Sequence, residues 1–248
     1  MKRNQWSPAS FFLGMLAVAF GILTGCSSVS GPPKSLAVQV DLGKLLNDRV
    51  IITQKDGRLQ MANHSLDHET SSFLITKSAA EISEAGKLNP LPDSGVFAAN
   101  AEHPDVQLPY GTAGSGPQVH RSPDRTETYS FSFPKKHYAQ MQLFFISAAG
   151  PTPISVRLQY ADGSSGQRTT LVPDFYFLLK PADKDWFVLA DDFGKVNRQG
   201  KMTESVHHFI HGFSLNPDPA KVLQQVEVSK LNSKSVLNLF GATGKLAD

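Results

Sequence analysis

Cysteine is almost absent from this 248-residue chain, which contains only Cys26. A disulfide bond needs two cysteines, so none can form within one chain, and the fold must be held together by its hydrophobic core. The chain also lacks a strong net charge. It carries 24 Lys and Arg against 22 Asp and Glu, and removal of residues 1–25, which contain Lys2 and Arg3 but no acidic residue, leaves 22 of each. This neutral composition gives no indication of a nucleic-acid partner.

Sequence motifs of catalysis are missing as well. The chain has no Gly-x-Ser-x-Gly motif, and the glycine-rich residues 111–116 are not followed by the Lys-Ser/Thr pair of a phosphate-binding loop. We therefore expect a non-catalytic protein. A surface hydrolase of the glycosidase type remains an alternative, because its two carboxylates meet through the fold and need not be close in the sequence.

Long hydrophobic runs are scarce too. An uncharged apolar stretch covers residues 11–22, which is short for a bilayer-spanning helix of about 20 residues. It follows the basic pair Lys2-Arg3 and precedes small residues, which is the order found in secretory signal peptides. We predict that residues 1–25 are a signal peptide that is removed from the mature protein.

The tetrapeptide Leu23-Thr24-Gly25-Cys26 directly follows this stretch. It resembles the lipobox of bacterial lipoproteins, in which the cysteine thiol receives diacylglycerol and the chain is cut just before it. The resemblance implies that Cys26 carries acyl chains such as palmitate and attaches the protein to a membrane of the bacterial cell envelope. Residues 26–35 are then a lipidated tether rich in Ser, Gly and Pro. Ser27, in place of an aspartate, implies the outer membrane if the host is Gram-negative.

From residue 36 onward the pattern is that of short strands separated by Gly, Pro, Asn and Asp. Residues 128–133 alternate hydroxyl and aromatic side chains, as a half-buried antiparallel strand requires. Residues 78–85 are expected to form a short helix, and residues 99–125 one long loop. We predict that residues 36–248 form a single all-β domain, an antiparallel β-sandwich or jelly roll.

Several short phrases resemble the galactose-binding-like β-sandwich domains of bacterial surface and carbohydrate-active proteins. In such domains a strand ends in Tyr-x-Asp-Gly, as in residues 160–163, and the next strand carries an Asp-aromatic pair, as in Asp174-Phe175. Residues 209–221 resemble a strand that ends in an Asn/Asp-Pro turn with a lysine, and two closing strands follow it. The resemblance implies a sandwich fold and carbohydrate binding, although folds of this kind carry many functions.

Two groups of residues are candidates for metal binding. His207 and His211 would share a helix face, but their surroundings are β-like, and on a strand they would lie more than about 10 Å apart, at about 3.3 Å per residue. We therefore interpret His207, His208 and His211 as ordinary strand histidines. Asp191 and Asp192 are candidate loop ligands for a structural calcium ion, although they lack the spacing of a calcium-binding loop.

Ligand contact is predicted for polar and aromatic side chains of the long loop together with the only tryptophan after residue 25. Aromatic faces and polar groups of this kind recognise sugars and peptides, and their alternative role is that of a polar loop with a core tryptophan. The candidate ligand-binding residues are Tyr110, His120, Arg121, Asp124, Arg125 and Trp186. We expect a lipid-anchored envelope protein that binds a glycan or another envelope protein. The remaining alternatives are a surface hydrolase and a purely structural or assembly lipoprotein.

Overall fold

The computed structural model of the chain describes residues 37–179 and 184–247. The predicted signal peptide, Cys26 and the tether up to residue 35 lie outside the described residues. Within the described part of the chain, no helix is long and apolar enough to span a membrane.

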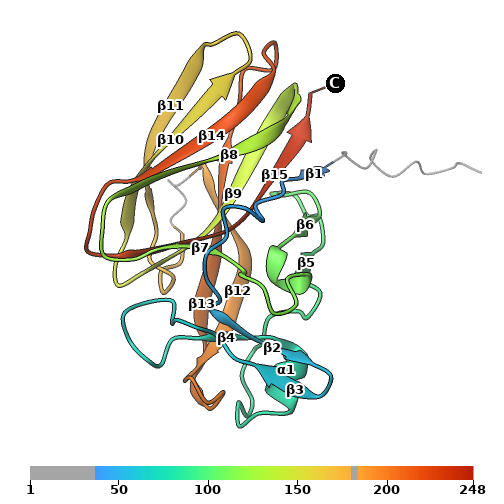
Figure 1. Cartoon of the computed structure of the whole chain (residues 1–248), viewed down its shortest axis with the longest axis vertical. Helices are drawn as coiled ribbons and strands as arrows, with labels where there is room; N and C mark the ends of the chain where they lie inside the picture. Colours follow the sequence, from blue (N-terminus) through green and yellow to red (C-terminus); the bar gives the residue numbers. More distant parts are fainter. Residues whose placement is uncertain (1–36, 180–183, 248) are drawn as a thin grey trace, which may run out of the picture. The chain divides into compact units, whose positions relative to one another are not determined.

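Two antiparallel sheets dominate the structure and confirm the all-β fold, which has the character of a β-sandwich (Figure 1). In the smaller sheet the strand order is β11 (Ser165–Val172), β10 (Thr152–Tyr160), β14 (Leu223–Lys230) and β8 (Glu127–Lys136). In the larger sheet the order is β1 (Ala37–Gln39), β15 (Val236–Leu246), β9 (Tyr138–Ala148), β13 (Met202–Leu215) and β12 (Trp186–Val196), and β7 (His120–Ser122) also pairs with β15.

The alternation predicted for residues 128–133 is present in β8. Tyr129, Phe131 and Phe133 are buried, whereas Thr128 and Ser130 are exposed. A strand whose hydroxyl face meets water and whose aromatic face meets apolar side chains gains hydrophobic free energy on one side only, which fits a sheet at the surface of a sandwich.

The neighbouring strands β9 and β15 of the larger sheet are buried on both faces, as their nearly continuous burial shows. Leu143 and Phe145 of β9 belong to the core shared with the smaller sheet. Phe144 and Ile146, which point to the other face, belong to a second core. The larger sheet is therefore a central layer between two hydrophobic cores.

The second core is covered by the N-terminal part of the domain. Short elements replace long strands here: β2 (Ile51–Lys55), β3 (Arg58–Gln60), β4 (Leu74–Ile75), α1 (Lys77–Glu81), β5 (Val96–Phe97), β6 (Val106–Gln107) and the 3-10 helix η1 (Pro109–Gly111). In Figure 1, β2, β3, β4 and α1 lie together near β12, and an isolated bridge joins Phe73 to Val196.

Two sequence predictions are corrected in this region. Residues 99–125 are not one long loop, because β6, η1 and β7 lie within them and Val106, Leu108 and Val119 are buried in the second core. The predicted helix is shorter than residues 78–85 and is preceded by Thr76, whose side chain makes no capping hydrogen bond. Tertiary packing, rather than local capping, holds this single turn of helix.

Gly212 of β13 gives a test of the packing in the second core. A Cβ atom at this position would lie 2.0 Å from the Phe187 ring, which is itself buried. We expect Gly212→Ala to lower the free energy of unfolding by about 2 kcal/mol, because overpacking of a filled core typically costs 1–3 kcal/mol. The measurement is urea denaturation.

Gly166→Ala is the matched control for Gly212→Ala. Gly166 lies on β11 at the edge of the smaller sheet, and no atom lies within 4 Å of a Cβ placed there. This variant should stay within about 0.5 kcal/mol of the wild type. Equal unfolding midpoints for the two variants would contradict the packing described for Phe187.

Candidate functional site

The most exposed cluster of large apolar side chains in the described residues follows directly after β11. Tyr176, Phe177 and Leu178 are 41%, 62% and 72% exposed. We call residues Asp174–Leu178 the aromatic turn. Large apolar side chains that project into solvent side by side cost hydration free energy, and they are typical of surfaces that meet a ligand.

The aromatic turn is held in place by the carboxylate of Asp174, which is almost completely buried. One carboxylate oxygen accepts the backbone N–H of Tyr176 at 3.1 Å and the other accepts the N–H of Gly150 at 2.7 Å. Burial raises the pKa of Asp174, although the two N–H donors favour its charged form. The side chain of Asp174 therefore links the aromatic turn to the connection between β9 and β10 by hydrogen bonds.

Backbone hydrogen bonds fix the same turn to two strands of the larger sheet. Phe175 donates its N–H to the carbonyl of Ser147 in β9 at 2.8 Å. Phe209 of β13 donates its N–H to the carbonyl of Phe175 at 2.9 Å. His211 of β13 lies with Nε2 3.2 Å from the carbonyl oxygen of Phe177. The exposed rings are thus carried by a backbone that is anchored on both sides.

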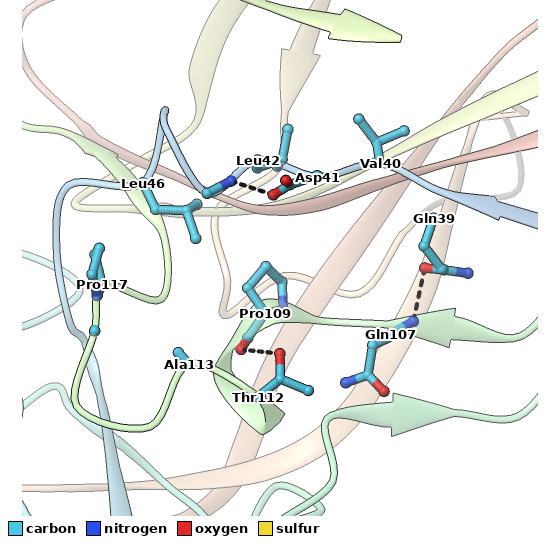
Figure 2. A pocket seen from close by; sticks show the side chains of 12 residues that line it. Gln39, Val40, Asp41, Leu42, Leu46, Gln107, Pro109, Thr112, Ala113 and Pro117 are labelled. Atoms are coloured by element: carbon cyan, nitrogen blue, oxygen red, sulfur yellow. Dashed lines mark hydrogen bonds between the residues drawn. The ribbon is translucent and has the colours of Figure 1, made fainter. Parts of the chain in front are cut away.

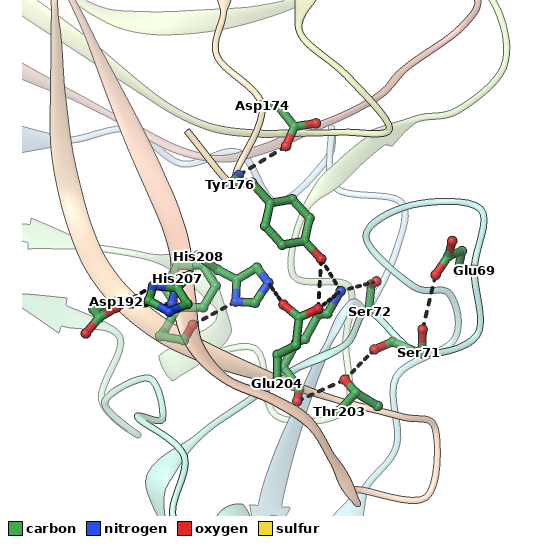
Figure 3. A network of polar contacts seen from close by, with 12 residues as sticks. Glu69, Ser71, Ser72, Asp174, Tyr176, Asp192, Thr203, Glu204, His207 and His208 are labelled. Carbon is green, nitrogen blue, oxygen red and sulfur yellow. Dashed lines mark hydrogen bonds and ion pairs between the residues drawn. The ribbon is translucent and has the colours of Figure 1, made fainter. Parts of the chain in front are cut away.

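Four polar side chains, which we call the polar network, lie together at the aromatic turn (Figure 3). It consists of Tyr176, Lys195 of β12, and Glu204 and His208 of β13. Lys195 Nζ donates a hydrogen bond to the phenol oxygen of Tyr176, and it lies 3.4 Å from Glu204 Oε1. The phenol of Tyr176 in turn donates to Glu204 Oε1 at 3.4 Å. Side chains of the aromatic turn and of β12 therefore meet at one carboxylate of β13.

The charges of the polar network follow from these contacts. Burial of Lys195 opposes its positive charge, but the contacts with Tyr176 and Glu204 outweigh that effect and raise the pKa of the ammonium group. Burial also raises the pKa of Tyr176, against the influence of Lys195. At neutral pH Lys195 is a cation and Tyr176 a neutral phenol. The ammonium group also lies 4.9 Å from the centre of the Tyr176 ring, within reach of a cation–π contact.

His208 closes the polar network on its buried side. Its side chain is completely buried, and Nδ1 donates to the carbonyl of Phe193 at 2.9 Å. Nε2 lies 3.0 Å from Glu204 Oε2, but outside the directional geometry of a hydrogen bond. Burial lowers the pKa of His208, although Phe193 and Glu204 act in the opposite direction. Burial and the Glu204 carboxylate therefore act on the imidazole in opposite directions, and burial has the larger effect.

Four of the predicted ligand residues lie on β7 and the loop that follows it. His120 is buried, with Nδ1 3.0 Å from the carbonyl oxygen of Leu45. Arg121 is largely buried and donates to the carbonyls of Ser65 and Asp67 at 3.1 and 2.9 Å. These two side chains support the backbone around them. Their role as ligand contacts stays a prediction that this geometry does not favour.

Asp124 and Arg125 are exposed, in contrast to their two neighbours. Asp124 pairs with His68 at 3.0 Å, and Arg125 pairs with Glu127 at 3.5 Å. Both are ion pairs at the surface, where screening by water leaves little net free energy. These two side chains remain accessible to a ligand.

Tyr110 and Trp186 lie on opposite faces of the larger sheet. Tyr110 is buried in the second core and donates to the carbonyl of Pro92 at 2.9 Å. Trp186 is half-buried, packs against the core between the sheets, and stacks on Phe213 with ring centres 4.8 Å apart. The six predicted residues therefore do not form one surface, because Tyr110 on η1 packs in the second core and Trp186 on β12 packs against the core between the sheets.

The candidate metal ligands are placed differently from the prediction. Asp191 and Asp192 lie within β12 and not in a loop, and Asp192 accepts the backbone N–H of His207 at 3.1 Å. His207 is exposed at a backbone irregularity with φ 82°, whereas His208 and His211 are completely buried. In residues 37–179 and 184–247, no group of three or more His, Asp or Glu is arranged to hold a metal ion. Calcium binding stays a prediction, and the described residues supply no cluster of ligands for it.

A pocket of about 410 Å³ lies between the chain after β1 and the chain around η1 (Figure 2). Its polar side chains already bond to neighbouring backbone groups. Gln39 accepts the N–H of Gln107 at 3.0 Å, Asp41 accepts the N–H of Gly43 at 2.8 Å, and Thr112 donates to the carbonyl of Pro109 at 3.2 Å. The rest of the lining is largely aliphatic, so the pocket offers little chemistry of its own.

No protein-family model matches this chain, and no curated protein matches it. The aromatic turn and the polar network therefore rest on geometry alone. Neither was predicted from the sequence, although residues 175–179 form an uninterrupted apolar run directly after Pro173-Asp174. Such a run next to turn-forming residues is a signal for apolar side chains held at a surface.

Proposed function

We propose that the protein is a non-catalytic, lipid-anchored component of the bacterial cell envelope that binds a glycan through the aromatic turn. The observation that carries the proposal is the position of Tyr176, an exposed aromatic ring whose phenol is held by Lys195 and Glu204. A ring that is fixed before binding loses little conformational entropy when a ligand packs on it.

The surroundings of Tyr176 suit a sugar. The C–H faces of a sugar ring pack on aromatic side chains, while its hydroxyl groups need acceptors such as carboxylates. Phe177 extends the aromatic surface, and the side chain of Glu204 is 43% exposed, so an acceptor and two rings are available to a ligand. The rings are exposed at the surface, which suits a polysaccharide better than a small enclosed molecule.

An envelope protein is the second candidate ligand, favoured by a specific observation. Phe177 and Leu178 are the two most exposed large hydrophobic side chains in the described residues. Exposed apolar anchors of this kind are typical of protein interfaces. The proposals of lipid attachment and envelope location come from the lipobox at residues 23–26.

Substitution of Tyr176 tests the glycan proposal. We expect the full-length protein, purified in detergent, to bind a subset of oligosaccharides on a glycan array. Tyr176→Ala should lower the affinity for the best of them by about tenfold or more, because central aromatic contacts often contribute over 1 kcal/mol. Tyr176→Phe, which keeps the ring, should have a smaller effect. Isothermal titration calorimetry measures both.

Ile82→Ala is the control for a lost exposed apolar side chain. Ile82 is 48% exposed and lies at the end of α1, and its replacement should leave the affinity unchanged. Equal affinities for Tyr176→Ala and the wild type would place the ligand elsewhere. Absence of glycan binding, together with stable capture of a purified envelope protein that depends on Phe177, would instead support the second candidate.

A further inference from the structure

A second pocket lies between β10 and β11 of the smaller sheet and the end of β13 in the larger sheet, and we call it the edge pocket. Its volume is about 270 Å³. Val156 and Leu158 of β10 and Leu215 of β13 line it from the core between the sheets. Arg168 of β11 and Asp185, which precedes β12, line it with charged groups. The edge pocket therefore combines an apolar floor with a polar rim, as small-molecule sites do.

Arg168 extends from the inner face of the smaller sheet. Residues directly opposite one another in antiparallel strands share a face, and Arg168 is paired with Val156, whose side chain is buried in the core between the sheets. The guanidinium group of Arg168 forms a hydrogen-bonded ion pair with the carboxylate of Asp185. Their side chains are 58% and 42% exposed. The ion pair therefore joins the two sheets at the rim of the pocket, within reach of a ligand from solvent.

The rim of the edge pocket is held in place by contacts between the sheets. The backbone carbonyl of Asp185 accepts the N–H of Ser214 in β13 at 2.7 Å. Trp186, the next residue, donates its Nε1–H to the hydroxyl of Thr170 at 3.1 Å. Thr170 follows Arg168 by two residues on β11 and therefore lies on the same face of that strand. A ligand would meet groups that are already positioned, which lowers the entropic cost of binding.

The charges of the edge pocket favour a neutral ligand. Among residues 37–179 and 184–247, the charged side chains that line it are Arg168 and Asp185, whose charges cancel. An anion would face the carboxylate, and a cation would face the guanidinium group. Arg168 only donates hydrogen bonds, Asp185 only accepts them, and the amide of Asn216 at the rim does both. The hydroxyl groups of a sugar match this set, and its C–H face can pack on the apolar floor.

The edge pocket and the aromatic turn lie along the same strand. His211 of β13 contacts the carbonyl of Phe177, and Leu215, four residues later on the same face, lines the pocket. At about 3.3 Å per residue, these two positions on β13 are about 13 Å apart. The pocket is also smaller than the sites of drug-sized ligands, so it suits a single sugar ring. We propose that the edge pocket binds a neutral terminal sugar of the glycan whose inner part contacts the aromatic turn.

Titration with single sugars tests the edge pocket without the aromatic turn. We expect at least one of glucose, galactose, mannose and N-acetylglucosamine to bind the full-length protein in detergent with a Kd of about 1–10 mM. Heteronuclear NMR measures this binding through the indole N–H of Trp186, which bonds to Thr170 beside the pocket. Its absence in Trp186→Phe assigns the signal. Galacturonate, which adds a negative charge to galactose, should bind more weakly. No saturable shift with any of the four sugars, or tighter binding of galacturonate, would overturn the proposal.

Arg168→Gln is the deciding variant, and Arg157→Gln is its matched control. Loss of the guanidinium group at residue 168 should weaken binding of the best of these sugars about tenfold. Arg157 lies on β10 of the same sheet, is exposed and points to the outer face, so its replacement should leave the affinity unchanged. Asp185→Asn is a second variant, which keeps an acceptor oxygen and removes the negative charge. It should reduce the preference for galactose over galacturonate. Equal affinities for Arg168→Gln and the wild type would contradict the assignment.

The link between the edge pocket and the aromatic turn rests on the proposed function, whereas binding of a single sugar in the pocket does not. Tyr176→Ala should leave the affinity for the single sugar unchanged. If single sugars bind through Arg168 but no oligosaccharide depends on Tyr176, the proposed function fails and the edge pocket stands. If oligosaccharide binding depends on Tyr176 and not on Arg168, the aromatic turn stands and the edge pocket is refuted.

Discussion

Replacement of Cys26 by serine is expected to abolish fatty-acid labelling of the protein and to release it from the membrane fraction. Acyl chains contribute about 0.8 kcal/mol per buried CH₂, and more than one chain is needed for durable attachment. Serine lacks the thiol that receives the lipid. Because Cys26 is the only cysteine in the chain, a thioester-linked or thioether-linked label has a single site of attachment.

Metabolic labelling with a fatty-acid probe, followed by membrane fractionation, checks this prediction. Ser28→Ala, two residues further along the predicted tether, is the matched control and should remain labelled and membrane-bound. A Cys26→Ser protein that still incorporates the probe would refute lipidation at this position. The measurement also tests the cell-envelope location, since that proposal depends on the same residue.

Acidification from pH 7 to pH 4 is expected to remove about 3 kcal/mol of stability through His211 alone. Burial lowers the pKa of His211 to about 4, against the opposing contact with the Phe177 carbonyl. In the unfolded chain the ordinary value is 6.5. The difference, at about 1.36 kcal/mol per pH unit, corresponds to about 3 kcal/mol.

The sign of this change in the free energy of unfolding follows from proton binding to the folded and unfolded chains. Below pH 6.5 the unfolded chain binds a proton at His211 before the folded chain does, so acid favours unfolding. The stabilisation is complete above pH 6.5 and is lost as the pH falls toward about 4. Since a domain is typically stable by only 5–15 kcal/mol, this loss is a large fraction of the total.

Urea denaturation of wild-type and His211→Gln protein at a series of pH values measures the effect. The glutamine amide can replace Nε2–H as the donor to the Phe177 carbonyl and does not titrate, so the stability of this variant should fall less steeply with acid. His207→Gln, at the exposed histidine, should follow the wild type. Parallel curves for wild type and His211→Gln would contradict the buried, neutral state of His211.

The fold class could be predicted because strand patterns are local. The alternating side chains of residues 128–133 indicate a strand with one solvent-exposed and one buried face, and β8 has both faces. The boundaries were less predictable. Asp191 and Asp192 were predicted in a loop but lie within β12, where irregular pairing with β13 accommodates two charged residues inside a strand.

The candidate site was less predictable than the fold. Tyr110 and Arg121 have the chemistry of ligand contacts, but both are held by backbone carbonyls in the interior. Conversely, Glu204 and Lys195 stood out in no motif, because they are meaningful only beside Tyr176. The roles of these side chains depend on their hydrogen-bond partners in the folded protein. Residue type alone does not specify those partners.

The sequence by itself determined the all-β class, the absence of intrachain disulfides and the predicted lipidation at Cys26, because each depends on short-range pattern or on composition. Only the tertiary structure decided which aromatic rings are exposed and which polar groups meet. The reason is physical: the aromatic turn follows β11, is hydrogen-bonded to β9 and β13, and contacts Lys195 of β12. Contacts between such segments arise only when these strands have paired and the second core, which contains Phe175, has formed.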